Sequence, residues 1–158
     1  MVEESRRDAY NWAIRALSRR MRSVQEIESG LLAKGVSHQV VVDVITDLLG
    51  MGYLDDLKFA SDWVELRSAR RGYGRVRLSH ELHGKGVPDE VARQVMDRYL
   101  SPARETEIAR KAIRKKMGGL RGSEVREKAH LYRFLRGRGF TSAAIWAALA
   151  DVEEEERG

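Results

Sequence analysis

At 158 residues, the chain is long enough for one ordinary domain or for a short array of small units. Charged residues make up 34% of it and there are only two prolines, which favours helices with wide solvated faces over a β or α/β fold. There is no cysteine, no apolar run near the ~18 residues that a membrane span needs, and no secretory start, so disulfides, a membrane protein and export are not expected. We therefore expect a soluble cytoplasmic protein, whose net charge of +5 suits a polyanion or an acidic protein surface as partner.

Apolar residues recur at helical spacing along the whole chain, and the pattern predicts nine helices. The first is expected over about residues 5–21. The second begins at Ser23, whose hydroxyl can cap the helix while Glu26 reaches back, as in a capping box. The third carries an apolar stripe from Val40 to Leu49 and ends at Gly50.

The second half of the chain continues this pattern of helices and short polar breaks. Asp55 is expected to cap a fourth helix with Phe59, Trp63 and Leu66 on one face. A short fifth helix follows the break at Gly72 and Gly74 and ends at Gly86, and a sixth begins at Pro88. The last three are expected from Ser101 to about Met117, from Ser123 to Arg136, and from Thr141 to about Ala150.

Residues 27–37, 78–88 and 131–141 align without gaps, which indicates an internal repeat. Each segment has an apolar helix, then a basic residue, then a glycine able to adopt the left-handed conformation, and then the start of another helix. The period of about fifty residues is the size of one three-helix unit. We therefore predict an all-α protein, an elongated array of three tandem three-helix repeats that share apolar faces, over residues 1–54, 55–100 and 101–150, with a frayed acidic tail over 151–158.

None of the candidate catalytic groups forms a convincing constellation. Asp55 and Asp56 are best explained as a helix start, and His80 and His83 have no third ligand at a metal-binding interval. Neither a phosphate-binding loop nor an activated nucleophile is present in the sequence. We expect no enzyme activity, no cofactor and no metal.

Basic residues gather at the breaks between helices and are the candidate partner-binding residues. The densest cluster surrounds Tyr73; its arginines could contact phosphates or acidic side chains, or only complement the negative helix end. The matching breaks of the first and third repeats are also basic, so the clusters recur with the repeat. The candidates are Arg67, Arg70, Arg71, Tyr73, Arg75, Arg77 and Lys85, then Arg19, Arg20 and Arg22, and then Lys111, Arg114, Lys115 and Lys116. Arg121 also lies at the third break.

One tryptophan falls in each repeat, at positions 12, 63 and 146. Each lies at helical spacing from other apolar residues. Buried packing is therefore favoured over stacking on a nucleobase for all three.

The middle repeat carries a longer pattern. It comprises Gly52-Tyr53-Leu54-Asp55-Asp56, Phe59-Ala60, Trp63, Arg67, Arg71-Gly72-Tyr73-Gly74, Arg77-Leu78, Glu81-Leu82 and Lys85-Gly86-Val87. This stretch resembles the central signature of the RecX family, and weaker similarity extends over nearly the whole chain. Arg75 stands where many members have proline, a residue that preorganises a helix start.

The resemblance implies three tandem three-helix repeats and a regulatory function. RecX proteins bind RecA, lie in the groove of its filament on single-stranded DNA, and inhibit its recombinase, ATPase and coprotease activities. We accordingly expect a monomer whose partner is RecA, with weak binding to single- or double-stranded DNA. The alternative is a free-standing DNA-binding protein of the helix-turn-helix kind.

Overall fold

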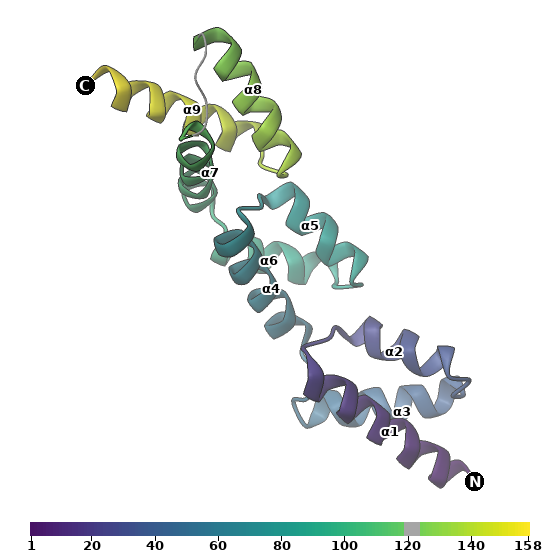
Figure 1. The fold of residues 1–158 in the computed structure, drawn as a ribbon. Coiled ribbons are helices and arrows are strands. Elements are labelled where there is room, and N and C mark those ends of the chain that lie inside the picture. The colour runs from purple at the N-terminus through teal and green to yellow at the C-terminus, as the bar shows by residue number, and fades with distance from the viewer. Residues whose placement is uncertain (119–123) are drawn as a thin grey trace. The chain divides into compact units, whose positions relative to one another are not determined.

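The computed structural model describes residues 1–118 and 124–158 (Figure 1). Within these ranges the chain is entirely α-helical, as predicted, and forms nine helices without a strand. Two residues named above lie outside the described residues, Arg121 of the third basic break and Ser123, the expected start of the eighth helix. The helices are α1 (Val2–Arg19), α2 (Val24–Ala33), α3 (His38–Gly50), α4 (Asp56–Arg71), α5 (Arg75–Gly84), α6 (Asp89–Tyr99), α7 (Pro102–Met117), α8 (Glu124–Gly137) and α9 (Ser142–Arg157).

The predicted helix starts are confirmed at the atomic level. The Ser23 hydroxyl accepts the amide hydrogen of Glu26, whose side chain accepts from the Ser23 amide, so the capping box is complete. Asp55 accepts from the Lys58 amide at 3.1 Å, as a cap of α4. Ser101 caps α7 through the Arg104 amide, with Pro102 in the first turn. The acidic and hydroxyl residues at these starts satisfy amides that the helices leave open.

The three repeated glycines adopt the predicted conformation. Gly35, Gly86 and Gly139 have φ values of +82°, +73° and +80°. In each case the next residue donates its amide back to the carbonyl of the buried leucine four residues before the glycine, from Val36 to Leu31, from Val87 to Leu82 and from Phe140 to Leu135. These are helix C-terminal motifs in which a left-handed glycine closes the last turn.

The chain packs as two compact units. The first comprises residues 1–60 and 82–92, and the second comprises residues 61–81 and 93–158. Because α4, α5 and α6 each contribute to both units, these units do not follow the predicted repeat boundaries. Those boundaries remain a prediction.

The core of the first unit is built where α1, α2 and α3 meet. Small residues of α1 let the other two helices approach closely, and aliphatic residues fill the space between them. The buried residues include Ala9, Ala13, Ala16, Ile27, Leu31, Val40, Val41, Val44 and Leu48.

No helix in the described ranges is long and apolar enough to cross a membrane.

In the second unit, α7 packs against α9. Its core includes Ile108, Ala109 and Ile113 of α7 together with the α9 residues Ile145 and Ala148. The buried carboxylate of Glu105 accepts the Thr141 amide at 2.7 Å and the Thr141 hydroxyl at 3.3 Å. This carboxylate therefore ties the first turn of α7 to the start of α9.

Two predictions about the last helix are wrong. First, α9 continues to Arg157 and does not end near Ala150 in a frayed tail. Its acidic residues pair with earlier helices: Asp151 with Arg110 at 3.4 Å, Glu153 with Lys128 at 2.7 Å, and Glu155 with Arg114 at 2.7 Å. Second, Trp146 is not buried but 53% exposed.

Two leucines of the predicted apolar faces are also about half exposed. Leu49 is 47% and Leu66 is 50% exposed. Helical spacing shows which residues share a face, but it does not show how wide the covered part of that face is.

Candidate partner-binding site

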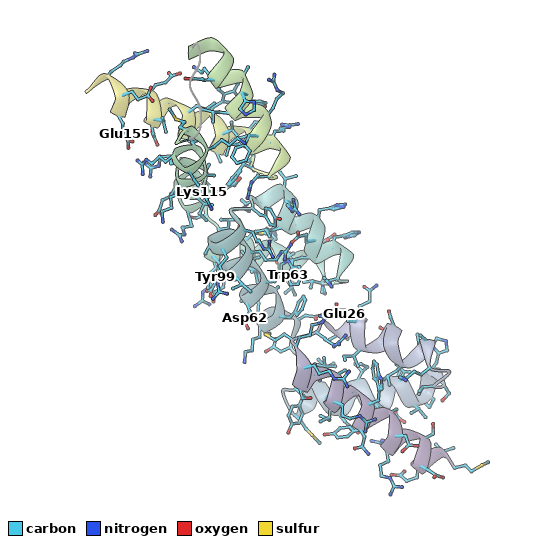
Figure 2. All side chains as sticks on the ribbon, viewed as in Figure 1. Glu26, Asp62, Trp63, Tyr99, Lys115 and Glu155 are labelled. Carbon is cyan, nitrogen blue, oxygen red and sulfur yellow. The ribbon has the colours of Figure 1, made fainter. Side chains whose placement is uncertain are left out.

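The basic cluster around Tyr73 is organised by one carboxylate, that of Glu81. Arg67 donates to it twice, from Nε at 2.8 Å and from Nη2 at 2.9 Å, and Arg77 donates from Nε at 3.2 Å. The Trp63 indole donates a further hydrogen bond at 2.9 Å; Trp63 is labelled in Figure 2. A two-pronged arginine–carboxylate pair of this kind fixes both side chains.

The rings of Tyr73 and Trp63 also contact these arginines. The Arg77 guanidinium lies 3.6 Å from the centroid of the Tyr73 ring. That of Arg67 lies 4.7 Å from the Trp63 ring and 5.3 Å from the Tyr73 ring. Such cation–π contacts orient the arginines further. Arg67 and Arg77 are therefore part of a fixed internal network.

The Glu81 carboxylate is held in its charged form. Burial alone would raise its pKa, but hydrogen bonds from Arg67, Trp63 and Arg77 outweigh this effect and lower the pKa below its ordinary value. The charge of Glu81 offsets part of the positive charge of the cluster. The arginines around Tyr73 thus present less positive charge than the sequence suggests.

The break between α4 and α5 is also the contact surface for the turn between α8 and α9. The Gly74 amide donates to the Arg138 carbonyl at 3.0 Å, and the Val76 amide donates to the Gly139 carbonyl at 2.9 Å. The Arg138 guanidinium donates in turn to the Arg71 carbonyl. Side chains larger than hydrogen have no room at Gly74, because a Cβ there would lie 2.6 Å from the Gly139 carbonyl oxygen.

The break between α1 and α2 makes the equivalent contact with the turn between α5 and α6. The Ser23 hydroxyl donates to the Lys85 carbonyl at 2.6 Å, and Lys85 Nζ donates to Glu26 at 2.7 Å. Burial alone would raise the pKa of Glu26, but hydrogen bonds from Lys85, Arg20 and the Ser23 amide lower it. The basic residues before Gly86 and Gly139, Lys85 and Arg138, thus each contact the preceding three-helix domain.

Asp56 connects the start of α4 to the start of α2. Its carboxylate accepts the Val24 amide at 3.0 Å, while burial, together with the charge of Asp55, raises its pKa. The interpretation of Asp55 and Asp56 as a helix start is therefore correct for Asp55, and Asp56 also connects two helix starts.

Most of the candidate residues are engaged within the chain. Arg75 donates to Asp97 at 2.9 Å and to the Leu100 carbonyl at 3.0 Å. Arg22 donates to the Ala16 carbonyl at 3.2 Å, and Lys111 pairs with Glu107 at 3.4 Å. The candidates with an intramolecular ion pair or hydrogen bond are Arg20, Arg22, Arg67, Arg75, Arg77, Lys85, Lys111 and Arg114.

The remaining basic candidates are exposed cations in the last turns of α1, α4 and α7. They are Arg19, Arg70, Arg71, Lys115 and Lys116, and we call them the helix-end cations. Within the described ranges, Arg19, Arg70 and Lys115 have no ion-pair or side-chain hydrogen-bond partner. Lys116 lies 5.1 Å from the centroid of the Phe134 ring. These residues can reach an external anion without breaking an internal ion pair.

Sequence reasoning missed the roles of Glu81 and Arg138. The signal for Glu81 was its position four residues after Arg77 on one helix, a spacing at which opposite charges meet. The signal for Arg138 was its alignment with Lys34 and Lys85 in the repeat. Nothing in the sequence pattern indicated that Trp63 would donate to Glu81.

In the part of the chain that the structure describes, the histidines do not gather with other metal-ligating side chains. His83 lies 3.5 Å from Asp89, and both side chains are largely exposed. Among the residues that the structure describes, no group of three or more histidine and carboxylate side chains is placed to hold a metal ion.

Comparison with known proteins places all three domains in one family. Residues 9–48, 55–96 and 103–149 match the family descriptions "RecX, first three-helix domain", "RecX, second three-helix domain" and "RecX, third three-helix domain". The chain is 34% identical to "Regulatory protein RecX" of Prosthecochloris aestuarii over 96% of its own length and 98% of the relative. It is also 34% identical to the protein of the same name from Vibrio vulnificus, over 88% and 89% of the two chains.

A solved structure has the same fold. The crystal structure of RecX from Lactobacillus salivarius matches with a TM-score of 0.87 at 18% identity, and the match covers 96% of this chain and 98% of that one. At this identity the likeness supports the fold alone.

Proposed function

Because this chain belongs to the RecX family of regulatory proteins, we propose that it binds RecA and its filament on single-stranded DNA. It inhibits the recombinase, ATPase and coprotease activities of RecA by lying in the filament groove. No covalent chemistry is needed, because a ligand shifts an assembly equilibrium toward the state that it binds better.

The observation that best supports the proposal is the recurrence of the helix-end cations. The first helix of each three-helix domain ends in exposed basic residues, at Arg19 in α1, at Arg70 in α4 and at Lys115 in α7. A RecA filament on DNA also repeats, with one protein subunit after another along a strand of phosphates. Cations that recur along the chain suit such a polymer, because each can meet an acidic side chain or a phosphate of a different repeating unit.

The internal networks have a different function in this proposal. Glu81 engages Arg67 and Arg77 within the second domain, and Glu26 of the first domain engages Lys85 of the second. These residues position the helix ends, and the helix-end cations contact the partner. Arg67, Arg75, Arg77 and Lys85 therefore act on binding indirectly, by holding the junctions.

The alternative is a free-standing DNA-binding protein, and the third helix of the first domain argues against it. A recognition helix needs polar and basic side chains that reach bases and phosphates. In contrast, α3 contains no lysine or arginine, and its exposed residues include Val42 and Leu49.

The test is RecA-catalysed ATP hydrolysis on single-stranded DNA, measured with increasing amounts of this protein and over a salt series. The proposal predicts dose-dependent inhibition that weakens as salt rises, because surface ion pairs and phosphate contacts are screened. Absence of inhibition at every salt concentration would refute it. Sequence-selective DNA binding without any effect on RecA would instead support the alternative.

A further inference from the structure

A hollow of about 600 Å³ lies between α8 and α9 in the second unit, beside an aromatic pair. Trp146 of α9 is 53% exposed, and its ring centroid lies 5.0 Å from that of Tyr132 on α8, with the ring planes 37° apart. Both residues line the hollow. A large indole that stays in solvent next to a second ring and an open space usually serves a partner.

The fold does not require this aromatic pair. Continuing the repeat alignment, the positions equivalent to Trp146 are Val42 in α3 and Arg93 in α6, and all three side chains are exposed. The positions equivalent to Tyr132 are Glu28 and Ser79, which are exposed as well. Three-helix domains of this chain therefore form without aromatic residues at these two places, so packing does not explain the pair.

The rim of the hollow is positively charged. Lys128, Arg133 and Arg157 line it together with a single carboxylate, Glu153. Glu153 is engaged by Lys128 at 2.7 Å, and this hydrogen bond lowers the pKa of Glu153, so the two residues form an ion pair at neutral pH and Arg133 and Arg157 supply the excess charge. The rim thus keeps an excess of positive charge beside two aromatic faces.

From this arrangement we propose that the hollow binds single-stranded DNA, with a base stacked on Trp146 and Tyr132 and the adjoining phosphates close to Arg133 and Arg157. Aromatic faces beside cations are the combination by which proteins hold single strands without reading their sequence. A base in duplex DNA is already stacked on both faces, so the site selects single strands. The proposal deepens the proposed function and rests on it for the source of the strand, but DNA binding here needs no contact with RecA.

The experiment is a titration of fluorescein-labelled (dT)20 with the full chain at low salt, followed by fluorescence anisotropy. Trp146→Ala should weaken binding about tenfold, since the loss of one base stacked on an aromatic residue changes the affinity by about this factor. Trp146→Phe should retain most of the affinity because it keeps an aromatic face. Val42→Ala is the matched control, an exposed residue at the equivalent position of the first domain, and should leave binding unchanged.

A second strand separates stacking from a general effect on charge or folding. A 20-mer lacking bases should bind the wild type about tenfold more weakly than (dT)20, and Trp146→Ala should lose this discrimination. Equal affinity of wild type and Trp146→Ala for (dT)20, or no binding by the wild type, would overturn the proposal. So would a wild type that self-associates through Trp146 in sedimentation while its DNA affinity does not depend on that residue.

These outcomes are distinct from failure of the proposed function. Loss of the aromatic contribution to (dT)20 binding is measured without RecA, whereas the proposed function fails only if the wild type does not inhibit RecA.

Discussion

The hydroxyl of Ser23 donates a hydrogen bond to the backbone carbonyl of Lys85, 62 residues later in the chain, at 2.6 Å. The same hydroxyl accepts the Glu26 amide as the cap of α2. In the next domain the amide of Gly74, which aligns with Ser23, donates to the carbonyl of Arg138, which aligns with Lys85. Two successive domain contacts thus use equivalent backbone carbonyls, those of Lys85 and Arg138, with different donors.

Ser23→Ala should lower the free energy of unfolding by about 2–3 kcal/mol, because it removes a helix cap and leaves the partly buried Lys85 carbonyl without this donor. Ser37→Ala is the control, since Ser37 caps α3 through the Val40 amide alone. Its expected cost is about 1 kcal/mol. Urea unfolding followed by circular dichroism measures both. Equal costs would show that the contact with Lys85 contributes nothing.

Gly74→Ala should lower stability by about 1–3 kcal/mol, as overpacking does. Its Cβ would press on the backbone of Gly139 and Phe140, which cannot move away as a flexible side chain could. Gly84→Ala is the matched control, because a Cβ at Gly84 meets nothing within 4 Å. Thermal unfolding should show a lower melting temperature for the first variant alone. An unchanged melting temperature for Gly74→Ala would contradict the close contact between the two backbones.

Glu81→Gln should weaken stability at neutral pH and flatten its dependence on acid pH. Since the network lowers the folded-state pKa of Glu81, its contribution is present above the unfolded pKa of about 4.3 and is lost as the pH falls through the lower folded-state pKa. The measurement is the free energy of unfolding between pH 7 and pH 3.

Glu65→Gln on the exposed side of α4 is the control for this series, and its pH profile should follow that of the wild type. If Glu81→Gln and the wild type lose stability in parallel below pH 4.3, the charged network does not stabilise the fold.

Truncation tests the last two turns of α9. Removing residues 151–158 deletes the buried Val152 and the ion pairs of Asp151, Glu153 and Glu155, and should lower the melting temperature by several degrees. Removing only residues 155–158 keeps Val152 and should have a small effect, because exposed ion pairs contribute little. Identical melting temperatures for the two truncated chains would indicate that this part of α9 adds no stability.

The fold was predictable because its signals are local. Ser23 with Glu26, Pro102 after Ser101, and the repeated glycine at positions 35, 86 and 139 each specify a helix start or end through neighbours a few residues away. The repeat period of about fifty residues then indicated that the helices are grouped in threes.

The site was predictable only in part, because its contacts are not local. Counting basic residues located the junction at Tyr73, but it could not show that Glu81 engages Arg67 and Arg77 while Arg70 stays unpaired within the described ranges. Likewise, apolar spacing placed Trp146 with the core. The solvent exposure of Trp146 depends on which helices pack against α9, and helical spacing carries no information about those neighbours.

The central claim is that the helix-end cations contact the partner. Its most direct test is inhibition of RecA-catalysed ATP hydrolysis by the double variant Arg70→Glu/Arg71→Glu. Arg7→Glu/Arg15→Glu is the control, with the same change in net charge at two exposed positions of α1 away from its C-terminal end. We predict that the first variant needs at least about tenfold more protein for half-inhibition, since two charge-assisted contacts become repulsive, while the control inhibits like the wild type. Equal inhibition by the two variants would contradict the claim that these helix ends contact the partner.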